Sequence, residues 1–115
     1  MTVETHNHEL DGAEFEYTYA ELGTVVVKFY DGLVKFEWID GPLGGESGCD
    51  FPYRVKRLST HQYLANWHEP AARGFVTLFI DLSKKRFYSS VLAAYGTEEE
   101  QVWLHEATLN RCEGI

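Results

Sequence analysis

Short runs of alternating apolar and polar residues, separated by turn-forming residues, dominate this chain. The clearest pair is TVVVKFY (24–30) and LVKFEWI (33–39), which flank Asp31-Gly32. Asp-Gly between two alternating runs is a strong hairpin signal, because both turn positions need a positive φ. Alternation sends successive side chains to opposite faces of a strand, so that one face can be buried. The pattern therefore predicts antiparallel strands joined by tight turns.

Eight such runs follow one another, and they predict an all-β domain. No long window favours the helical period, although residues 97–109 could also be read as a helix. Eight short strands with hairpin connections favour a single antiparallel up-and-down β-barrel, with a strongly curved sheet as the alternative. A closed barrel of eight strands has an interior just wide enough for side chains or one small ligand. The other six runs are residues 13–19, 52–59, 61–69, 75–81, 85–93 and 101–110.

Length and composition indicate one folded domain. The chain has 115 residues, of which 44% are hydrophobic and 15% aromatic, so it can bury a real core. This composition argues against disorder and suits half-buried strands. We expect residues 1–12 to form a polar N-terminal lead-in and residues 13–115 to form the single barrel domain.

Charge and cysteine usage restrict the partners and the compartment. The formal net charge of -8 would repel a phosphate backbone, so nucleic acid is not an expected partner. No apolar run approaches the roughly 20 residues that span a bilayer, so no membrane partner is expected. The N-terminus lacks the basic and apolar regions of a signal peptide, which favours a cytoplasmic protein. Cys49 and Cys112 should then be free thiols.

Two of the runs place polar groups among aromatic rings. Alternation puts Tyr17 and Tyr19 on one face of the first run, and Tyr63, Trp67 and Glu69 on one face of the fifth. A carboxyl group in an aromatic pocket has a raised pKa, because desolvation disfavours its charged form. It could then donate or accept a proton near neutral pH. The alternative is that Glu69 ends its strand in water, while the tyrosines are core residues whose hydroxyls reach the surface.

Other candidates are weaker. Trp38 and His105 could also face the interior, although a histidine with satisfied hydrogen bonds at the core or rim is the simpler interpretation. His6 and His8 form a His-x-His pair, but a zinc site needs three or four converging ligands, so no metal site is predicted. No Ser/His/Asp constellation, nucleophile elbow, P-loop or dinucleotide fingerprint is visible in the sequence.

Four segments of the sequence carry a resemblance to a known family: YTY (17–19), GPLGG (41–45), NWHEP (66–70) and VWLHEATL (102–109). They resemble segments of the bacterial phenolic acid decarboxylases and the related MoaF-like proteins, small barrels of the lipocalin-like (calycin) type. In that family two tyrosines hold the substrate and a glutamate is the acid/base residue. The resemblance therefore implies these roles for Tyr17, Tyr19 and Glu69, and it implies no metal or organic cofactor.

One position departs from the family pattern. The arginine that follows the Gly-rich turn in the decarboxylases is replaced here by Glu46, an anion that would repel a carboxylate substrate. Arg54 or Arg57 could substitute from the next strand, if either points inward.

Three functions remain open from the sequence. The first is a MoaF-like barrel that binds a small aromatic or phenolic molecule in its interior. The second is a cofactor-free lyase of the phenolic acid decarboxylase type, with Glu69 as acid/base. The third is an interaction domain without a ligand. A homodimer is plausible, since two-fold dimers are the commonest oligomers. The predicted binding residues are Tyr17, Tyr19, Trp38, Tyr63, Trp67, Glu69 and His105.

Overall fold

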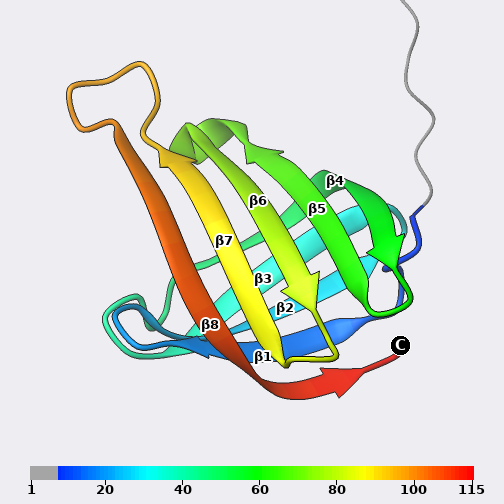
Figure 1. The fold of residues 1–115 in the computed structure, drawn as a ribbon. Helices are drawn as coiled ribbons and strands as arrows, with labels where there is room; N and C mark the ends of the chain where they lie inside the picture. Colours follow the sequence, from blue (N-terminus) through cyan, green and yellow to red (C-terminus); the bar gives the residue numbers. More distant parts are fainter. Residues whose placement is uncertain (1–7) are drawn as a thin grey trace, which may run out of the picture.

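Eight antiparallel strands hydrogen-bond in chain order, and the last strand pairs with the first (Figure 1). The computed structural model describes residues 8–115. The predicted up-and-down β-barrel of eight strands is confirmed. The elements are β1 (Glu14–Tyr19), β2 (Gly23–Tyr30), β3 (Leu33–Asp40), β4 (Ser47–Ser59), β5 (Gln62–Glu69), the 3₁₀ turn η1 (Pro70–Ala72), β6 (Gly74–Asp81), β7 (Arg86–Ala93) and β8 (Gln101–Glu113).

Two strands are longer than their sequence runs. β4 begins at Ser47, inside the stretch expected to be a loop, and β8 continues to Glu113. Closure explains the length of β8, because residues 101–108 pair with β7 while residues 107–113 pair with β1. The helical alternative for residues 97–109 is wrong, since this segment is a turn followed by strand.

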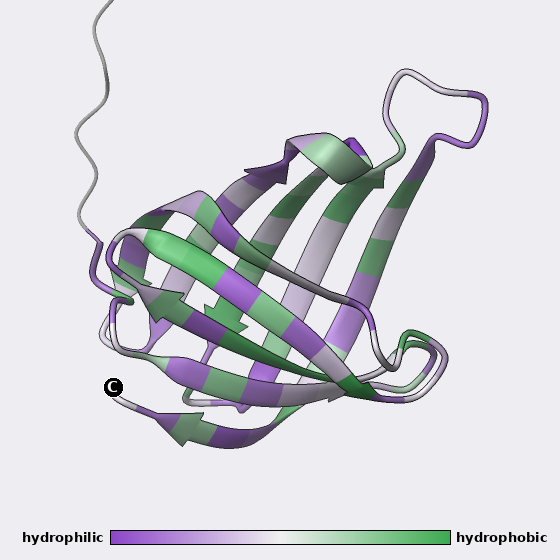
Figure 2. Ribbon diagram, turned by 180° about the vertical axis from the view of Figure 1, so that it is seen from behind, coloured by the Kyte–Doolittle hydropathy of each residue, from purple (hydrophilic) through white to green (hydrophobic). Residues whose placement is uncertain are grey.

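Alternation along the strands separates the core from the surface. In β1, Phe15, Tyr17 and Tyr19 are buried, while the residues between them are only partly buried. Figure 2 shows the same alternation as purple and green bands across the strands. Among residues 8–115, no helix is both long enough and apolar enough to cross a membrane.

One end of the barrel is filled by phenylalanine rings. Phe15 packs edge-on against Phe29 and Phe87, with ring centroids 6.2 and 5.3 Å apart, and all three side chains are fully buried. Edge-to-face pairs of this kind add to the stabilisation from burial. The interior at this end is therefore packed core, and any cavity must lie toward the other end.

The described part of the lead-in packs against this filled end. Leu10 is fully buried, and Asp11 accepts hydrogen bonds from the backbone N–H of Gly32 at 3.0 Å and from the Tyr53 hydroxyl at 2.8 Å. Residues 10 and 11 thus join the β2–β3 turn to β4. Residues 1–7 lie outside the described part of the chain.

Candidate functional site

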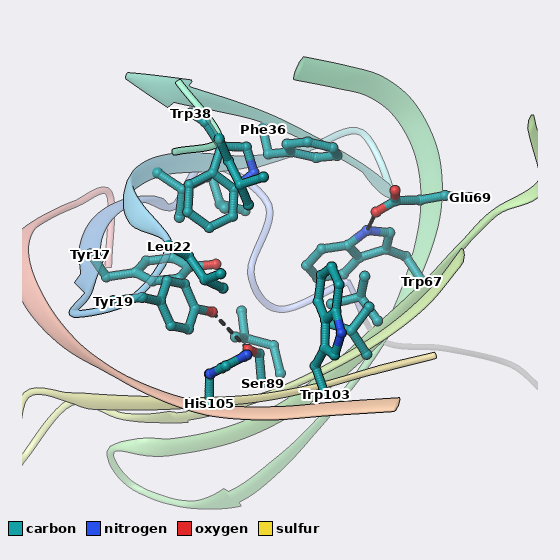
Figure 3. Close-up of a pocket in the computed structure, with 16 residues that line it drawn as sticks. Tyr17, Tyr19, Leu22, Phe36, Trp38, Trp67, Glu69, Ser89, Trp103 and His105 are labelled. Carbon is teal, nitrogen blue, oxygen red and sulfur yellow. Dashed lines mark hydrogen bonds between the residues drawn. The ribbon is translucent and has the colours of Figure 1, made fainter. Parts of the chain in front are cut away.

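The opposite end of the barrel contains a cavity that opens at the ends of β1, β3, β5 and β7. The cavity has a volume of about 90 Å³. On the same measure one water molecule needs roughly 10–15 Å³, so the cavity has room for several waters or a small ligand. Its wall combines aliphatic side chains with six aromatic ones, which are Tyr17, Tyr19, Phe36, Trp38, Trp67 and Trp103 (Figure 3).

Two glycines let a loop lie against the mouth of this cavity. Gly23 has φ +103°, and a Cβ there would meet the Asp40 carbonyl oxygen at 2.1 Å. Gly41 has φ +83°, and its Cβ would lie 2.4 Å from the Gly23 Cα. Only glycine tolerates both the conformation and the close approach. The loop that follows Gly41 carries Leu43 into the cavity wall.

The structure brings together most of the predicted binding residues. Tyr17, Tyr19, Trp38, Trp67, Glu69 and His105 all line the cavity.

Tyr63 is the exception among the predicted binding residues. It is buried but does not line the cavity, because it lies near the opposite end of β5 from Glu69. Six residues along a strand correspond to about 20 Å, and Tyr63 belongs to the filled end.

Two hydroxyl groups are hydrogen-bonded to each other on one side of the cavity. The Tyr19 hydroxyl donates to Ser89 Oγ at 2.9 Å, and the Tyr19 ring meets the Tyr17 ring edge-on with centroids 5.6 Å apart. Burial raises the pKa of Tyr19 to about 12 and that of Tyr17 well above its usual value. Both phenols therefore remain protonated at neutral pH and act as hydrogen-bond donors.

Glu69 lies on the other side of the cavity (Figure 3). Its Oε2 accepts a hydrogen bond of 2.7 Å from Trp67 Nε1. Desolvation raises the pKa of the Glu69 carboxyl, although the bond from Trp67 and the proximity of His68 act in the opposite direction. His68 itself faces outward, where its Nε2 lies 2.6 Å from the Tyr95 hydroxyl.

The raised pKa of Glu69 predicts a pH-dependent gain of stability in Glu69→Gln. A carboxyl whose folded pKa exceeds its unfolded value stabilises the fold below the unfolded pKa, and this contribution is lost as the pH rises through the folded pKa. The amide stays neutral and keeps an acceptor for Trp67. At about pH 7 the melting temperature of Glu69→Gln should therefore be higher than that of the wild type. At about pH 4, near the ordinary pKa of glutamate, the two melting temperatures should be the same. Thermal unfolding at both values checks this; a constant difference would contradict it.

His105 stands at the rim beside a carboxylate. Its Nδ1 lies 3.0 Å from Oε1 of Glu21, a residue of the β1–β2 turn. The His105 ring also meets Tyr19 edge-on, with centroids 6.2 Å apart. Trp103, the neighbouring residue on the same face of β8, donates from its Nε1 to Gln101 Oε1 at 2.7 Å.

Neither arginine replaces the missing cation. Arg54 points outward and donates to Asn66 at 3.0 Å. Arg57 donates to the carbonyls of residues 59 and 60 at the filled end of the barrel. The side chain of Glu46 is exposed, and its carbonyl accepts from the Trp38 N–H at 2.8 Å. Among the described residues that line the cavity there is no lysine or arginine.

The described residues offer no cluster that would hold a metal ion. No group of three or more His, Cys, Asp or Glu side chains converges within residues 8–115. His8 packs instead on the Tyr53 ring, with centroids 5.2 Å apart. Its partner in the sequence motif, His6, lies outside the described residues.

Sequence reasoning missed Ser89 and Leu43, and its list of binding residues also lacked Phe36 and Trp103 of the aromatic wall. Alternation within residues 85–93 would have placed Ser89 inward, but a serine there signals nothing until its neighbours across the strands are known. Leu43 sits in a loop without periodicity, and only the fold of that loop brings it to the cavity.

Comparison with known proteins supports the fold. No protein-family model matches the sequence, and no curated protein matches it. A solved structure described as a "putative beta-lactamase from Burkholderia vietnamiensis" is similar, with a TM-score of 0.77 and 21% sequence identity. The similarity covers 92% of this chain and 98% of that one. At this identity the chain shares with that protein the small β-barrel fold.

Proposed function

We propose that the barrel binds one small, uncharged aromatic or phenolic molecule in the cavity at its open end, as a MoaF-like protein of the lipocalin type. The composition of the cavity wall carries this proposal: aromatic rings surround a few hydrogen-bonding groups, and no cation lines the described wall. Small-molecule pockets typically combine an apolar lining with a few placed polar groups.

The polar groups stand at two separate places in the wall. The hydroxyl groups of Tyr17, Tyr19 and Ser89 offer a hydroxyl group of the ligand both donors and acceptors. Glu69, at the other side, can accept a hydrogen bond from an N–H or O–H group of the ligand, as it does from Trp67. A ligand carboxylate would lie near Glu69 without a compensating cation, and burying an unpaired charge is unfavourable. The site therefore favours a neutral ligand over its anionic analogue.

Fluorescence titration with two matched ligands tests this preference. All three tryptophans of the protein line the cavity, so a bound aromatic molecule should quench their emission. We expect para-coumaramide to bind at least about tenfold more tightly than the para-coumarate anion, a difference of about 1.4 kcal/mol. Tyr19→Phe should weaken binding of the amide, while Tyr88→Phe, on the outer face, should not. Equal affinity for the anion would refute the preference for neutral ligands.

The lyase alternative needs the same cavity to accept a carboxylate. Glu69 is positioned to exchange a proton with a ligand, which favours this function. The absence of an arginine or lysine from the described wall disfavours it. Release of carbon dioxide and para-vinylphenol from para-coumarate would support the lyase instead.

The interaction-domain alternative has its own support on the outer surface. Val102 and Leu104 of β8 are 73% and 78% exposed, and Tyr88 of the neighbouring strand is also exposed. Exposed apolar residues on adjacent strands are a feature of contact surfaces. If no aromatic compound quenched the tryptophans, this alternative would replace ligand binding.

A further inference from the structure

Strand register places a serine and a histidine next to each other in the cavity wall, and a carboxylate of the β1–β2 turn lies beside the histidine. Ser89 of β7 and His105 of β8 are direct partners across the two strands, and both line the cavity. Side chains directly opposite each other in an antiparallel pair have Cβ atoms about 4.5–5.5 Å apart. Figure 3 shows the two side chains together at the same side of the pocket.

The partners of this pair have the polarity that nucleophilic catalysis requires. The carboxylate of Glu21 accepts from Nδ1 of His105 at 3.0 Å, so the proton is held on Nδ1 and Nε2 is the basic nitrogen. Ser89 Oγ accepts from the Tyr19 hydroxyl, which leaves the serine proton directed toward another acceptor. Ser89 is 4% exposed, and the wall of the open cavity is the surface through which a small molecule would reach it.

We propose that Ser89 is a nucleophile that takes an acyl group from small activated aryl esters, with His105 as its general base and Glu21 as a positioning residue. The same order of serine, imidazole and carboxylate performs acyl transfer on several unrelated folds, where it is recognised by geometry and not by sequence position. The aromatic wall suits an ester whose leaving group is a phenol.

The reaction balances without a metal, oxidant or cofactor. Ser89 Oγ attacks the ester carbonyl carbon while its proton passes to Nε2 of His105. Once Ser89 Oγ is bonded to the substrate, the Tyr19 hydroxyl can donate instead to the former carbonyl oxygen, which becomes negative. Collapse breaks the bond to the phenol oxygen, which receives the proton from His105. Water then attacks the acyl-serine with His105 again as base, giving the carboxylic acid and free Ser89.

Acylation of the protein by para-nitrophenyl acetate tests the proposal. Intact-mass measurement should show addition of one acetyl group, and peptide mapping should place it on Ser89. The rate of para-nitrophenolate release gives the kinetics. Ser89→Ala should lose the mapped label, whereas Ser90→Ala, one residue further along β7 and exposed on the outer face, should keep it. Mapping of the wild-type label needs no variant, so a poorly folding variant does not weaken the test.

Two further variants separate base and positioning roles from a structural role. His105→Gln should slow acetylation about a hundredfold or more, the usual contribution of a general base. Glu21→Gln should lower the acylation rate constant but leave the KM for the ester unchanged, because Glu21 lies behind His105.

The proposal fails if the wild-type acetyl group maps only to lysines or the N-terminus, or if Ser89→Ala is acetylated as fast as wild type. The proposed nucleophile lies in the same cavity as the proposed ligand site, but the two proposals are tested by different measurements. Quenching by para-coumaramide without acylation at Ser89 would leave ligand binding standing and refute the nucleophile.

Discussion

Phe87→Ala should lower the free energy of unfolding by about 3–5 kcal/mol, the range for truncating a buried phenylalanine. Phe87 is fully buried, and its ring lies 5.3 Å from Phe15 and 4.5 Å from Tyr17, centroid to centroid. Its loss removes apolar burial and leaves a void that surrounding strands of a closed barrel can only partly fill. Because a domain of this size has a total stability of about 5–15 kcal/mol, the change should be visible directly in urea denaturation.

Two matched variants check the cause of this loss. Phe87→Leu keeps most of the buried volume, so its cost should be clearly smaller than that of the alanine variant. Tyr88→Ala truncates the neighbouring ring on the outer face, where it is 39% exposed, and should cost less than about 1 kcal/mol. If Phe87→Ala cost no more than Tyr88→Ala, the filled end would not be the principal core of the barrel.

The same variant connects the core to the cavity. Tyr17 packs against the Phe87 ring on one side and against the Tyr19 ring in the cavity wall on the other. With Phe87 truncated, Tyr17 can tilt toward the new void and lose its contact with Tyr19. We therefore expect weaker quenching by para-coumaramide in Phe87→Ala even at temperatures where the variant is fully folded.

Alternation was enough to predict the fold and the face of each strand. Tyr17 and Tyr19 were placed together because a strand has a period of two, and hairpin connections favoured a closed barrel of eight strands over a strongly curved sheet. The boundaries of β4 and β8 could not be predicted in this way. They depend on closure, which requires a strand to bend and pair with two neighbours along different parts of its length.

Alternation also could not predict which inward-facing residues lie at the filled end of the barrel and which line the cavity. Tyr63 and Glu69 share a face of β5, yet one belongs to the filled end and the other to the cavity. Which end is filled depends on how Phe15, Phe29 and Phe87 from three strands meet. The contact between these three rings depends on how neighbouring strands are aligned, and no single strand encodes this register.

The proposed nucleophile illustrates the same limit. Ser89 and His105 lie in different runs of the sequence, and no spacing between them carries a signal. They become neighbours only because β7 and β8 pair with Ser89 opposite His105. Glu21, which contacts His105, belongs to the β1–β2 turn and lies 84 residues before it in the sequence. A constellation of this kind is invisible until the barrel is closed.

Asp11→Ala should lower the free energy of unfolding by about 1.5–3 kcal/mol, although Asp11 itself is exposed. Tyr53 is 2% exposed, and its hydroxyl donates to the Asp11 carboxylate at 2.8 Å. Burial and this hydrogen bond together raise the pKa of Tyr53, so the phenol stays a donor. Removing the carboxylate leaves the Tyr53 hydroxyl and the Gly32 N–H without their hydrogen-bond acceptor. An unsatisfied buried polar group costs about 1–3 kcal/mol.

A double-mutant cycle with Tyr53→Phe isolates the hydrogen bond from the rest of the effect. In the Tyr53→Phe background the hydroxyl is already gone, so Asp11→Ala should cost less, and the remainder measures the bond to Gly32. Asp11→Asn keeps an acceptor oxygen and should fall between wild type and Asp11→Ala. Equal costs of Asp11→Ala in both backgrounds would mean that Tyr53 does not depend on Asp11. The stabilising role of Asp11 would then rest on its hydrogen bond to Gly32.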